Sequence, residues 1–363
     1  MSKGKVLVAM SGGVDSSVAA ALLKEQGYEV YGATMRLWSP AGEEYYDNPG
    51  SCCSLSSVED ARRVAHRLEI PFYVLNFREA FNEKVVEYFI AEYRAGRTPN
   101  PCIACNRYLK FDRFLEKALA LGLDLIATGH YARLTYDLEH DRHFLEKARD
   151  ESKDQTYALY NLQPQQLRYI LFPLGDLTKS EVREIAHRYD LPTAEKEESQ
   201  EICFIPDNDY KRFLQDEAGL AERPGEIVDQ EGRVLGQHSG VHNYTVGQRR
   251  GLGLVHPQPL YVVELRPETN QVVVGTADQV WSEALLAAEA NLLHWPTNGT
   301  VAQLTAKIRY SAPEEPCTVQ LLDQGRFLVK FDRQVRAVTP GQAVVLYAGQ
   351  RVVGGGIIQG PMK

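Results

Sequence analysis

The sequence has no apolar run approaching the length of a membrane span, and its first residues lack the basic-then-apolar pattern of a secretory signal. It has only six cysteines in 363 residues, which is too few for a disulfide-stapled scaffold. These scarcities predict a soluble, cytoplasmic protein without a membrane partner. In that compartment its thiols remain available for chemistry.

Acidic residues outnumber basic ones, and the formal net charge of −8 argues against a nucleic-acid partner if the charge is spread evenly. The charge is not even. Residues 281–363 hold eight Lys and Arg against six Asp and Glu, and residues 93–111 hold four basic residues and no acid. Local basic patches of this kind are able to bind RNA, because RNA binding depends on the electrostatic field near the patch and not on the net charge of the protein.

The chain also lacks the two commonest phosphate-binding motifs, G-x-x-x-x-G-K-[ST] and G-x-G-x-x-G. Instead, an apolar run over residues 6–10 predicts a buried strand, Ser11, Gly12 and Gly13 predict a tight turn, and residues 14–26 have helical spacing. This order directs backbone N–H groups and a positive helix end at one point, where phosphate binds. Gly12 and Gly13 allow close approach of the anion, and Ser11, Ser16 and Ser17 add hydroxyl donors. The alternative is a glycine turn with a capping serine.

The first part of the chain alternates strands and helices, which predicts an α/β fold with a doubly wound parallel sheet and ligands at the carboxyl ends of its strands. We expect strands at residues 30–35, 71–77 and 123–128, and helices at 56–68 (opened by a capping box), 80–93 and 108–121. A hairpin at 134–148 and helices near 155–161 and 179–189 come next.

After residue 207 the pattern becomes β-rich, with candidate strand regions at residues 224–235, 240–253 and 260–275. Short alternating strands from residue 300 onward predict a small barrel. At 363 residues the chain suggests two or three domains. We expect a catalytic domain at residues 1–207, a central β-rich connector at 208–281 and a C-terminal β-barrel at 282–363.

Cys102 and Cys105 have C-x-x-C spacing in a stretch whose two prolines predict a stiff loop before the helix at 108–121. A thiol there, near Arg107 and Lys110, is expected to have a lowered pKa and to react as the thiolate. A zinc site would need a second pair of ligands, which the sequence does not supply.

The four other cysteines carry less information. Cys203 lies 98 residues beyond Cys105, and its neighbours leave open a buried strand or a strand end. Cys52 and Cys53 suggest a non-catalytic loop, and Cys317 a core position.

The loop from Ser11 to Ser16 resembles the PP-loop of ATP pyrophosphatases, which cleave ATP between its α and β phosphates. Together with five further stretches, it resembles the bacterial tRNA-specific 2-thiouridylases over nearly the whole chain. Those stretches are Gly129-His130, Lys153-Asp154-Gln155, residues 202–205, residues 244–252 and Arg309-Tyr310. Membership of this family implies thiolation of the wobble uridine, position 34, of tRNAs such as those for Lys, Glu and Gln.

The resemblance implies a reaction in two stages. ATP first adenylates the 2-carbonyl oxygen of uracil, with Asp15 helping to hold Mg²⁺. Sulfur then comes from a persulfide on Cys203, delivered by a donor such as a cysteine desulfurase or a relay protein. Cys105 is the nucleophile, and Cys105 and Cys203 end as a disulfide. A monomer is expected.

The resemblance also assigns binding residues. It implies ATP contacts by residues of the loop and of two strand ends: Ala9, Met10, Ser11, Gly12, Gly13, Val14, Asp15, Ser16, Met35 and Gly129. It implies tRNA contacts by Asn100, Pro101, Cys102, His130, Lys153, Asp154, Gln155, Arg309, Tyr310 and Gln342, with Asn100 and Pro101 beside the flipped target base. Without the resemblance, His130 reads as a strand-end histidine, residues 153–155 as a solvated turn, and Arg309-Tyr310 as an exposed strand pair.

The sequence departs from the family pattern at Cys102, where that pattern has an aspartate able to shuttle a proton. Three thiols, Cys102, Cys105 and Cys203, then leave a [4Fe–4S] cluster open as a minority mechanism. Two other functions also stay open at this point. One is a PP-loop ligase or amidotransferase for a small substrate, which would not need the cysteines. The other is a non-catalytic RNA-binding module.

Overall fold

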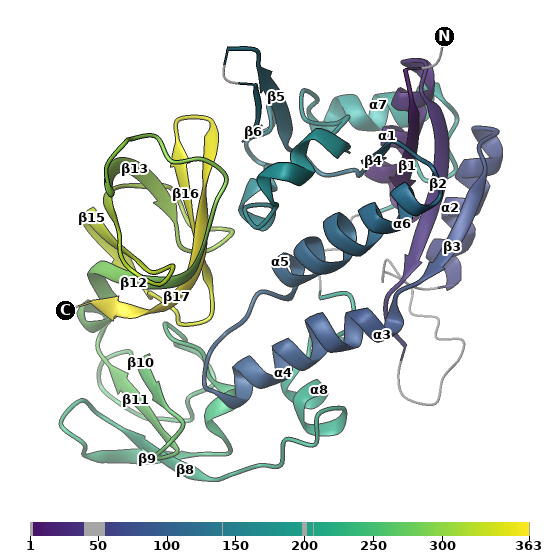
Figure 1. Ribbon diagram of the computed structural model, residues 1–363. Coiled ribbons are helices and arrows are strands. Elements are labelled where there is room, and N and C mark those ends of the chain that lie inside the picture. Colours follow the sequence, from purple (N-terminus) through teal and green to yellow (C-terminus); the bar gives the residue numbers. More distant parts are fainter. Residues whose placement is uncertain (1–2, 40–54, 140, 198–201, 206, 363) are drawn as a thin grey trace. The chain divides into compact units, whose positions relative to one another are not determined.

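The computed structural model describes residues 3–39, 55–139, 141–197, 202–205 and 207–362. Figure 1 shows the elements of the chain, which divides into two compact units. The first comprises residues 1–86, 102–208 and 350–352, and the second comprises residues 87–101, 209–349 and 353–363. Among the helices so described, none is long and apolar enough to cross a membrane.

The first unit is built on a five-stranded sheet in the order β3-β2-β1-β4-β7, in which every neighbouring pair is parallel. The expected doubly wound parallel sheet is confirmed. Its strands are β1 (Lys5–Ala9), β2 (Glu29–Arg36), β3 (Phe72–Asn76), β4 (Leu125–Ala127) and β7 (Ile170–Leu171).

Most helices come after the strands as the periodicity predicts, but only a 3₁₀ turn forms where a helix is expected near residues 155–161. They are α1 (Val14–Glu25), α2 (Leu55–Arg67), α3 (Arg78–Phe81), the π-helical turn η1 (Asn82–Val86), α6 (Phe114–Ala120), the short 3₁₀ turns η3 (Thr156–Ala158) and η4 (Pro164–Tyr169), and α7 (Lys179–Arg188). Ser56, expected as the cap of a capping box, lies inside α2, so that helix begins earlier than its polar sequence indicates.

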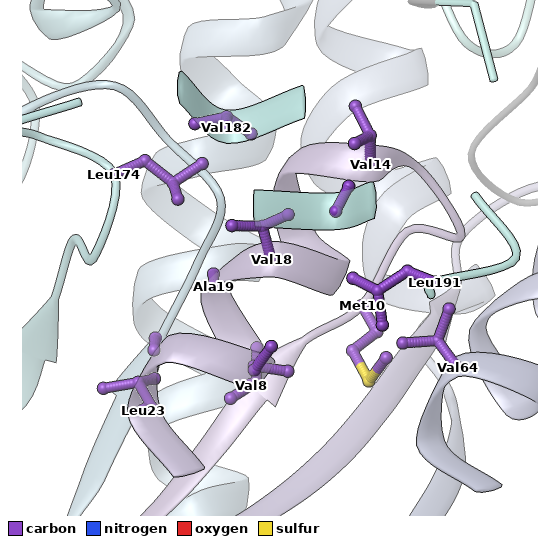
Figure 2. Packing of buried hydrophobic residues seen from close by; sticks show 14 of the residues in the cluster. Val8, Met10, Val14, Val18, Ala19, Leu23, Val64, Leu174, Val182 and Leu191 are labelled. Carbon is purple, nitrogen blue, oxygen red and sulfur yellow. The ribbon is translucent and has the colours of Figure 1, made fainter. Parts of the chain in front are cut away.

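The core beside α1 explains why the first strand is so apolar. Val6 and Val8 of β1 are fully buried in a cluster that includes Val18 of α1 and Val182 of α7. Figure 2 shows Val8, Val18 and Val182 within this packed layer. Since side chains alternate along a strand, Leu7 points to the other face and is also fully buried. Burial on both faces is what a central parallel strand requires.

One expected boundary is wrong. The helix assigned to 108–121 begins at Pro101, as α5 (Pro101–Cys105), and continues through the π-helical η2 (Asn106–Arg113) into α6. Pro101 is therefore the first helical residue, a position where the missing N–H costs nothing. Cys102 and Cys105 are helical residues instead of members of a loop before the helix.

The second unit contains a four-stranded sheet in the order β10-β11-β8-β9. Its strands are β8 (Gly225–Val228), β9 (Val234–His238), β10 (Tyr261–Arg266) and β11 (Gln271–Gly275), with β11 parallel to β8. The strand expected at residues 240–253 is wrong, because that segment holds a 3₁₀ turn, η5 (Val241–Asn243), and irregular backbone. The unit also contains α4 (Glu87–Arg94) and α8 (Tyr210–Asp216).

The expected C-terminal barrel is confirmed. After the 3₁₀ turn η6 (Ala277–Val280), its strands run in the order β12-β15-β14-β13-β16-β17, and pairing of β12 with β17 closes it. They are β12 (Trp281–Leu292), β13 (Val301–Lys307), β14 (Glu315–Leu321), β15 (Phe327–Arg336), β16 (Ala343–Ala348) and β17 (Arg351–Met362). Cys317 lies in the barrel core, as expected.

The start of β17 completes the first unit. The hairpin of β5 (Arg133–Asp137) and β6 (Arg142–Glu146) pairs with β17 at Arg351, opposite Glu146. Arg351 Nε lies 3.2 Å from Glu146 Oε1, and its guanidinium lies 4.0 Å from the Phe144 ring centre. The sequence predicts the hairpin but not its pairing with the last strand.

Candidate active site

The phosphate-binding turn lies between β1 and α1, where Gly12 has a φ of +72°. A Cβ on Gly12 would lie 2.1 Å from the backbone oxygen of Ser57 in α2. Both the left-handed conformation and the close approach therefore require glycine. No side chain caps α1 at Gly13, so the first N–H groups of the helix stay available for an anion.

Gly129, just beyond β4, closes the other side of this turn. A Cβ there would lie 2.6 Å from Ser16 N and 2.8 Å from the carbonyl carbon of Asp15. Only glycine lets the end of β4 approach the first turn of α1 so closely. The structure thus brings together two regions that the sequence predicts to contact ATP.

The serine hydroxyls of the loop are used differently from the expectation. Ser16 Oγ accepts a hydrogen bond from Ser11 N at 3.1 Å and donates to Gly13 O at 3.2 Å. Ser17 is fully buried, and its hydroxyl donates to Gly13 O at 2.8 Å. Ser17 therefore stabilises the turn instead of facing a ligand, whereas Ser11 is exposed.

Other predicted ATP contacts come from buried side chains. Ala9, Met10, Val14 and Met35 are at most 9% exposed. Met10 and Val14 belong to the core cluster seen in Figure 2. In this arrangement the residues next to the turn offer a ligand their backbone more than their side chains.

Asp15, the second residue of α1, is held by two groups that the sequence analysis did not single out. Lys179 Nζ lies 2.7 Å from Asp15 Oδ1, and the Tyr131 hydroxyl donates to the same oxygen at 2.8 Å. The Lys179 side chain is only 12% exposed. The sequence held one signal for this role of Lys179. A lysine at the first position of a helix opposes the helix dipole, so its presence there suggests that its positive charge serves another purpose.

The predicted RNA-contacting turn is linked to the same network. Gln155 Oε1 accepts from Tyr131 N at 3.0 Å, and Gln155 N donates to Tyr131 O at 3.0 Å. Asp154 accepts from Ala148 N at 2.9 Å and from the Thr156 hydroxyl at 2.6 Å. Asp154 and Gln155 therefore fix the shape of this half-buried turn, which is not simply solvated.

His130, next to Gly129, is held as a neutral imidazole. Its Nδ1 is hydrogen-bonded to Thr128 Oγ1 at 2.7 Å, and its ring contacts those of Phe111 and Phe172. Burial, with a smaller effect of the Lys110 charge, holds the pKa of His130 well below its ordinary value of 6.5. At neutral pH His130 offers a hydrogen bond instead of a positive charge.

The cysteines fall into distinct environments. Cys102 is exposed, Cys105 is buried at the end of α5, and both are reduced thiols. Cys203 is also reduced and is half-buried. Cys317 differs, because burial, followed by the Asp332 carboxylate, raises the pKa of its thiol to about 12. Cys52 and Cys53 lie outside the described residues.

Cys203 occupies a turn, so neither the buried strand nor the strand end considered for it is correct. Ile205 N donates to Ile202 O at 2.8 Å across this turn. Phe204 is 1% exposed and packs edge-on against Phe81 at 5.7 Å between ring centres. The buried aromatic ring anchors the turn while the preceding thiol stays partly exposed.

The described residues do not group Cys102, Cys105 and Cys203 as metal ligands. Over the parts of the chain that the structure describes, no set of three or more His, Cys, Asp or Glu side chains is placed to hold a metal ion. The arrangement of these three thiols therefore gives the cluster mechanism no support.

In the second unit, the loop before Pro101 is held by the barrel. Gln342 Nε2 donates to Thr98 O at 2.8 Å and to Pro99 O at 3.3 Å, and Thr98 N donates to Pro340 O at 2.9 Å. Asn100 and Pro101, predicted to lie beside the target base, come directly after this fixed segment. Gln342 itself uses its amide nitrogen on the loop.

Arg309 and Tyr310 lie in a turn after β13, not in the strand pair considered for them. Arg309 donates to Arg336 O at 3.2 Å. Tyr310 is 48% exposed, and Lys307 Nζ lies 5.9 Å from its ring centre. An exposed aromatic ring beside a lysine ammonium group suits stacking against an RNA base.

Three family models match successive parts of the chain. The model of the tRNA methyl transferase HUP domain matches residues 4–207, the tRNA methyl transferase PRC-barrel domain residues 211–276, and the aminomethyltransferase beta-barrel domain residues 282–358. The tRNA-specific 2-thiouridylase MnmA of Carboxydothermus hydrogenoformans is 55% identical over 98% of this chain and 97% of that relative. The chain belongs to the tRNA-specific 2-thiouridylase family.

Other 2-thiouridylases match equally completely. The relative from Moorella thermoacetica is 55% identical over 97% of this chain and 99% of its own length. The one from Acetivibrio thermocellus is 53% identical over 99% of this chain and 100% of its own length. The resemblance inferred from the motifs is confirmed, and the similarity to these relatives extends over 97–99% of this chain.

Proposed function

We propose that this chain catalyses the ATP-dependent 2-thiolation of uridine 34 in tRNA. One observation carries the proposal: a single compact unit holds the glycine-lined phosphate turn and the reduced thiols Cys105 and Cys203, in a chain that matches 2-thiouridylases over 98% of its length. Residues 1–207 would form the catalytic domain, 208–281 the connector and 282–363 the barrel.

In the first stage, the 2-carbonyl oxygen of uracil attacks the α-phosphorus of ATP. The bond between that phosphorus and the bridging oxygen breaks, and its electron pair leaves with pyrophosphate. The turn at Gly12 and Gly129 supports this role, because helix N–H groups converge where the phosphates would lie.

In the second stage, the terminal sulfur of a Cys203 persulfide attacks C2, and AMP leaves with the original oxygen. The Cys105 thiolate then attacks the Cys203 sulfur, which leaves the transferred sulfur on C2 and forms a Cys105–Cys203 disulfide. A dithiol reductant restores both thiols with two electrons. Alternatively, Cys105 attacks the persulfide first and frees sulfide, which attacks C2.

Magnesium fits the residues at the turn. The Asp15 carboxylate lies in the first turn of α1, beside the N–H groups that would bind phosphate, and its side chain is 30% exposed. Mg²⁺ is usually held by one or two carboxylates together with substrate phosphates. Asp15 would hold the ion, which would supply positive charge to the polyphosphate.

The predicted RNA contacts remain part of this proposal. Asn100, Pro101 and Cys102 would adjoin the target base, while His130, residues 153–155, Arg309, Tyr310 and Gln342 would contact tRNA. The exposure of Cys102 and Tyr310 supports these roles. A persulfide-carrying donor protein, a monomeric state and a cytoplasmic location also remain proposals.

The test is single-turnover thiolation of unmodified tRNA with ATP, driven either by a persulfide or by sulfide. Cys105→Ser should lose persulfide-driven thiolation, and Cys203→Ser should lose it while retaining sulfide-driven activity. Cys317→Ala, which changes the unreactive barrel thiol, is the matched control and should thiolate normally. Full persulfide-driven activity in Cys105→Ser and Cys203→Ser would contradict the proposal.

A further inference from the structure

Residues 244–252 carry part of the family resemblance, but the proposed ATP and sulfur chemistry does not use them. Their surroundings in the sequence have an unusual charge for a protein with a formal net charge of −8. Residues 234–263 contain two arginines, Arg249 and Arg250, and neither Asp nor Glu. A segment with this charge attracts an anion.

The backbone around these arginines forms an irregular loop, here called the arginine loop (residues 244–253). Two of its glycines have left-handed conformations, with a φ of +90° at Gly247 and +76° at Gly251. Gly247 N donates to Val262 O of β10 at 2.8 Å, and Val262 N donates to Gln248 O at 2.9 Å. The arginine loop is therefore joined to β10 by a pair of backbone hydrogen bonds.

The side chain of Gln248 fixes the loop on both sides of Arg249. Its Oε1 accepts a hydrogen bond from Thr245 N at 3.1 Å, and its Nε2 donates to Arg250 O at 2.9 Å. Since the backbone is held in this way, little conformational freedom is lost from it when a ligand binds the two arginines.

The arginines of this loop differ from those that flank it in the sequence. Arg233 pairs with Asp229, and Arg266 pairs with Glu264. Arg249 and Arg250 are both exposed, and within the described parts of the chain neither forms an ion pair with a carboxylate. Their charges are therefore available to an anion from outside the chain, and guanidinium groups match the geometry of phosphate oxygens.

The arginine loop lies against the segment that leads to the residues predicted beside the target base. Thr245 Oγ1 lies 3.4 Å from Thr98 Oγ1, and Thr98 comes two residues before Asn100. These residues all belong to the second unit. The loop is thus a neighbour of the segment at which the proposed function expects RNA.

The same loop also contacts the barrel near another predicted RNA contact. A Cβ on Gly247 would lie 2.6 Å from the Cβ of Ala337, so the loop packs closely on the end of β15. Arg336, the residue before Ala337, accepts a hydrogen bond from Arg309 at its backbone oxygen. The arginine loop therefore connects two regions that the proposed function assigns to tRNA.

Resting on the proposed tRNA thiolation, we propose that the arginine loop binds backbone phosphates of the tRNA. Arg249 and Arg250 contact the phosphates, and Gln248 positions them. Phosphate contacts fix the register of a nucleic acid and carry no base information. The loop holds the tRNA strand beside the segment that leads to Asn100, while other residues recognise the base.

The test measures binding of unmodified tRNA to the full-length chain over a series of salt concentrations, without ATP. Each phosphate contact contributes about 0.7 to 0.9 to the slope of the logarithm of the association constant against the logarithm of the salt concentration. Arg249→Gln/Arg250→Gln should therefore reduce the magnitude of this slope by about 1 to 2, and should weaken binding about 10-fold at low salt. An unchanged slope would overturn the proposal.

Arg233→Gln is the matched control. It removes an exposed arginine of the same unit whose guanidinium already lies 2.5 Å from Asp229 Oδ2 and 3.1 Å from Glu231 Oε2. Because the protein itself neutralises that charge, the salt slope of this variant should equal that of the wild type.

A charge-conserving variant separates phosphate binding from a purely structural role. Arg249→Lys/Arg250→Lys keeps both positive charges and should keep most of the salt slope. If its slope fell as far as that of Arg249→Gln/Arg250→Gln, the arginines would serve only to shape the loop, and the proposal would be wrong.

Two further probes distinguish phosphate binding from other ways of using the arginines. The double glutamine variant should lose the same factor of affinity for a tRNA with uridine 34 and for the same tRNA with cytidine 34. A loss confined to the uridine tRNA would assign the loop to base recognition and overturn the proposal. Weaker binding of an acidic peptide, polyglutamate, with normal tRNA binding would overturn it in favour of an acidic protein partner.

The proposed thiolation is tested separately from this binding. Binding without ATP requires neither catalytic thiol, so Cys105→Ser and Cys203→Ser should keep the salt slope of the wild type. If the wild type failed to thiolate tRNA, the proposed function would fall, while the slope would still decide whether the arginine loop binds RNA.

Discussion

Two loops of this molecule are fixed in opposite ways. The turn between β1 and α1 is shaped by backbone packing at Gly12 and Gly129, and α1 keeps its first N–H groups clear of side-chain caps. The loop before Pro101 is held by a side chain, Gln342, which occupies the carbonyls of Thr98 and Pro99. The first arrangement offers donors to a ligand, whereas the second uses polar groups to position the next residues of the chain.

Replacing Gly12 should have the largest effect. Gly12→Ala places a Cβ 2.1 Å from Ser57 O in a left-handed backbone conformation, and should lower the free energy of unfolding by about 3 kcal/mol or more. Gly13→Ala is the control, because its Cβ would lie at an ordinary 3.5 Å from Ser11 Oγ and its φ is −96°. Urea unfolding measures both.

The same two variants also test whether the turn binds phosphate. Gly13→Ala should keep the stability of the wild type within about 1 kcal/mol and yet bind ATP more weakly, because its Cβ intrudes where phosphate approaches. Normal ATP affinity in Gly13→Ala would mean that the phosphates do not approach the backbone there.

Gly129→Ala should have the next largest effect. Its Cβ would lie 2.6 Å from Ser16 N, so β4 and α1 must separate, at a cost of about 2 kcal/mol. ATP affinity should fall together with the thermal midpoint. Gly299→Ala, where nothing lies within 4 Å, should change neither quantity. If Gly129→Ala behaved like this control, the backbone-packed description of the turn would be wrong.

Gln342→Leu tests the side-chain-held loop. It removes two hydrogen bonds and should cost about 1–2 kcal/mol of stability. The KM for tRNA should rise several-fold while ATP affinity stays unchanged, because only the segment leading to Asn100 is loosened. Gln359→Leu, on an exposed strand position where the amide donates to Ile357 O, is the control. A change in ATP affinity instead would remove the distinction between the two loops.

The smallest effect is expected from His130. Its pKa is lowered in the folded chain, so protonation favours the unfolded state. The stability that neutral His130 contributes is present above its ordinary pKa of 6.5 and is lost as the pH falls below that value. His130→Gln should therefore lose less stability than the wild type between pH 7.5 and pH 5, as thermal midpoints will show.

His143, His238 and His242 also have lowered pKa values. They titrate in both proteins, so the difference between wild type and His130→Gln isolates His130. Equal acid sensitivity of the two proteins would contradict burial of a neutral imidazole at this position.

Local features of the fold were predictable from the sequence, and long-range ones were not. The strand, turn and helix around Gly12 are encoded by apolar runs and glycines within a dozen residues. The ion pair of Asp15 with Lys179 joins residues 164 apart, and no local pattern encodes it. Pro101 misled the prediction because proline both ends and begins helices.

At the candidate site, too, local motifs were predictable from the sequence and long-range contacts were not. Family motifs identified the cysteines and the loop, but the turn around Cys203 depends on Phe204 packing against Phe81, more than a hundred residues away. The four-stranded sheet of the second unit gives another example. A β-rich sequence favours hairpins between consecutive strands, but β8 pairs in parallel with β11, although β9 and β10 lie between them in the chain.

The pairing of Arg351 with Glu146 has a consequence for how the protein is made. Residues 350–352 belong to the first unit, although they are synthesised after almost all of the second. On the ribosome, the first unit therefore cannot complete its packing until residues 350–352 emerge. A nascent chain that stops before Gln350 lacks both the strand residue that pairs with Glu146 and the strand β17 that closes the barrel, so neither unit can complete its fold.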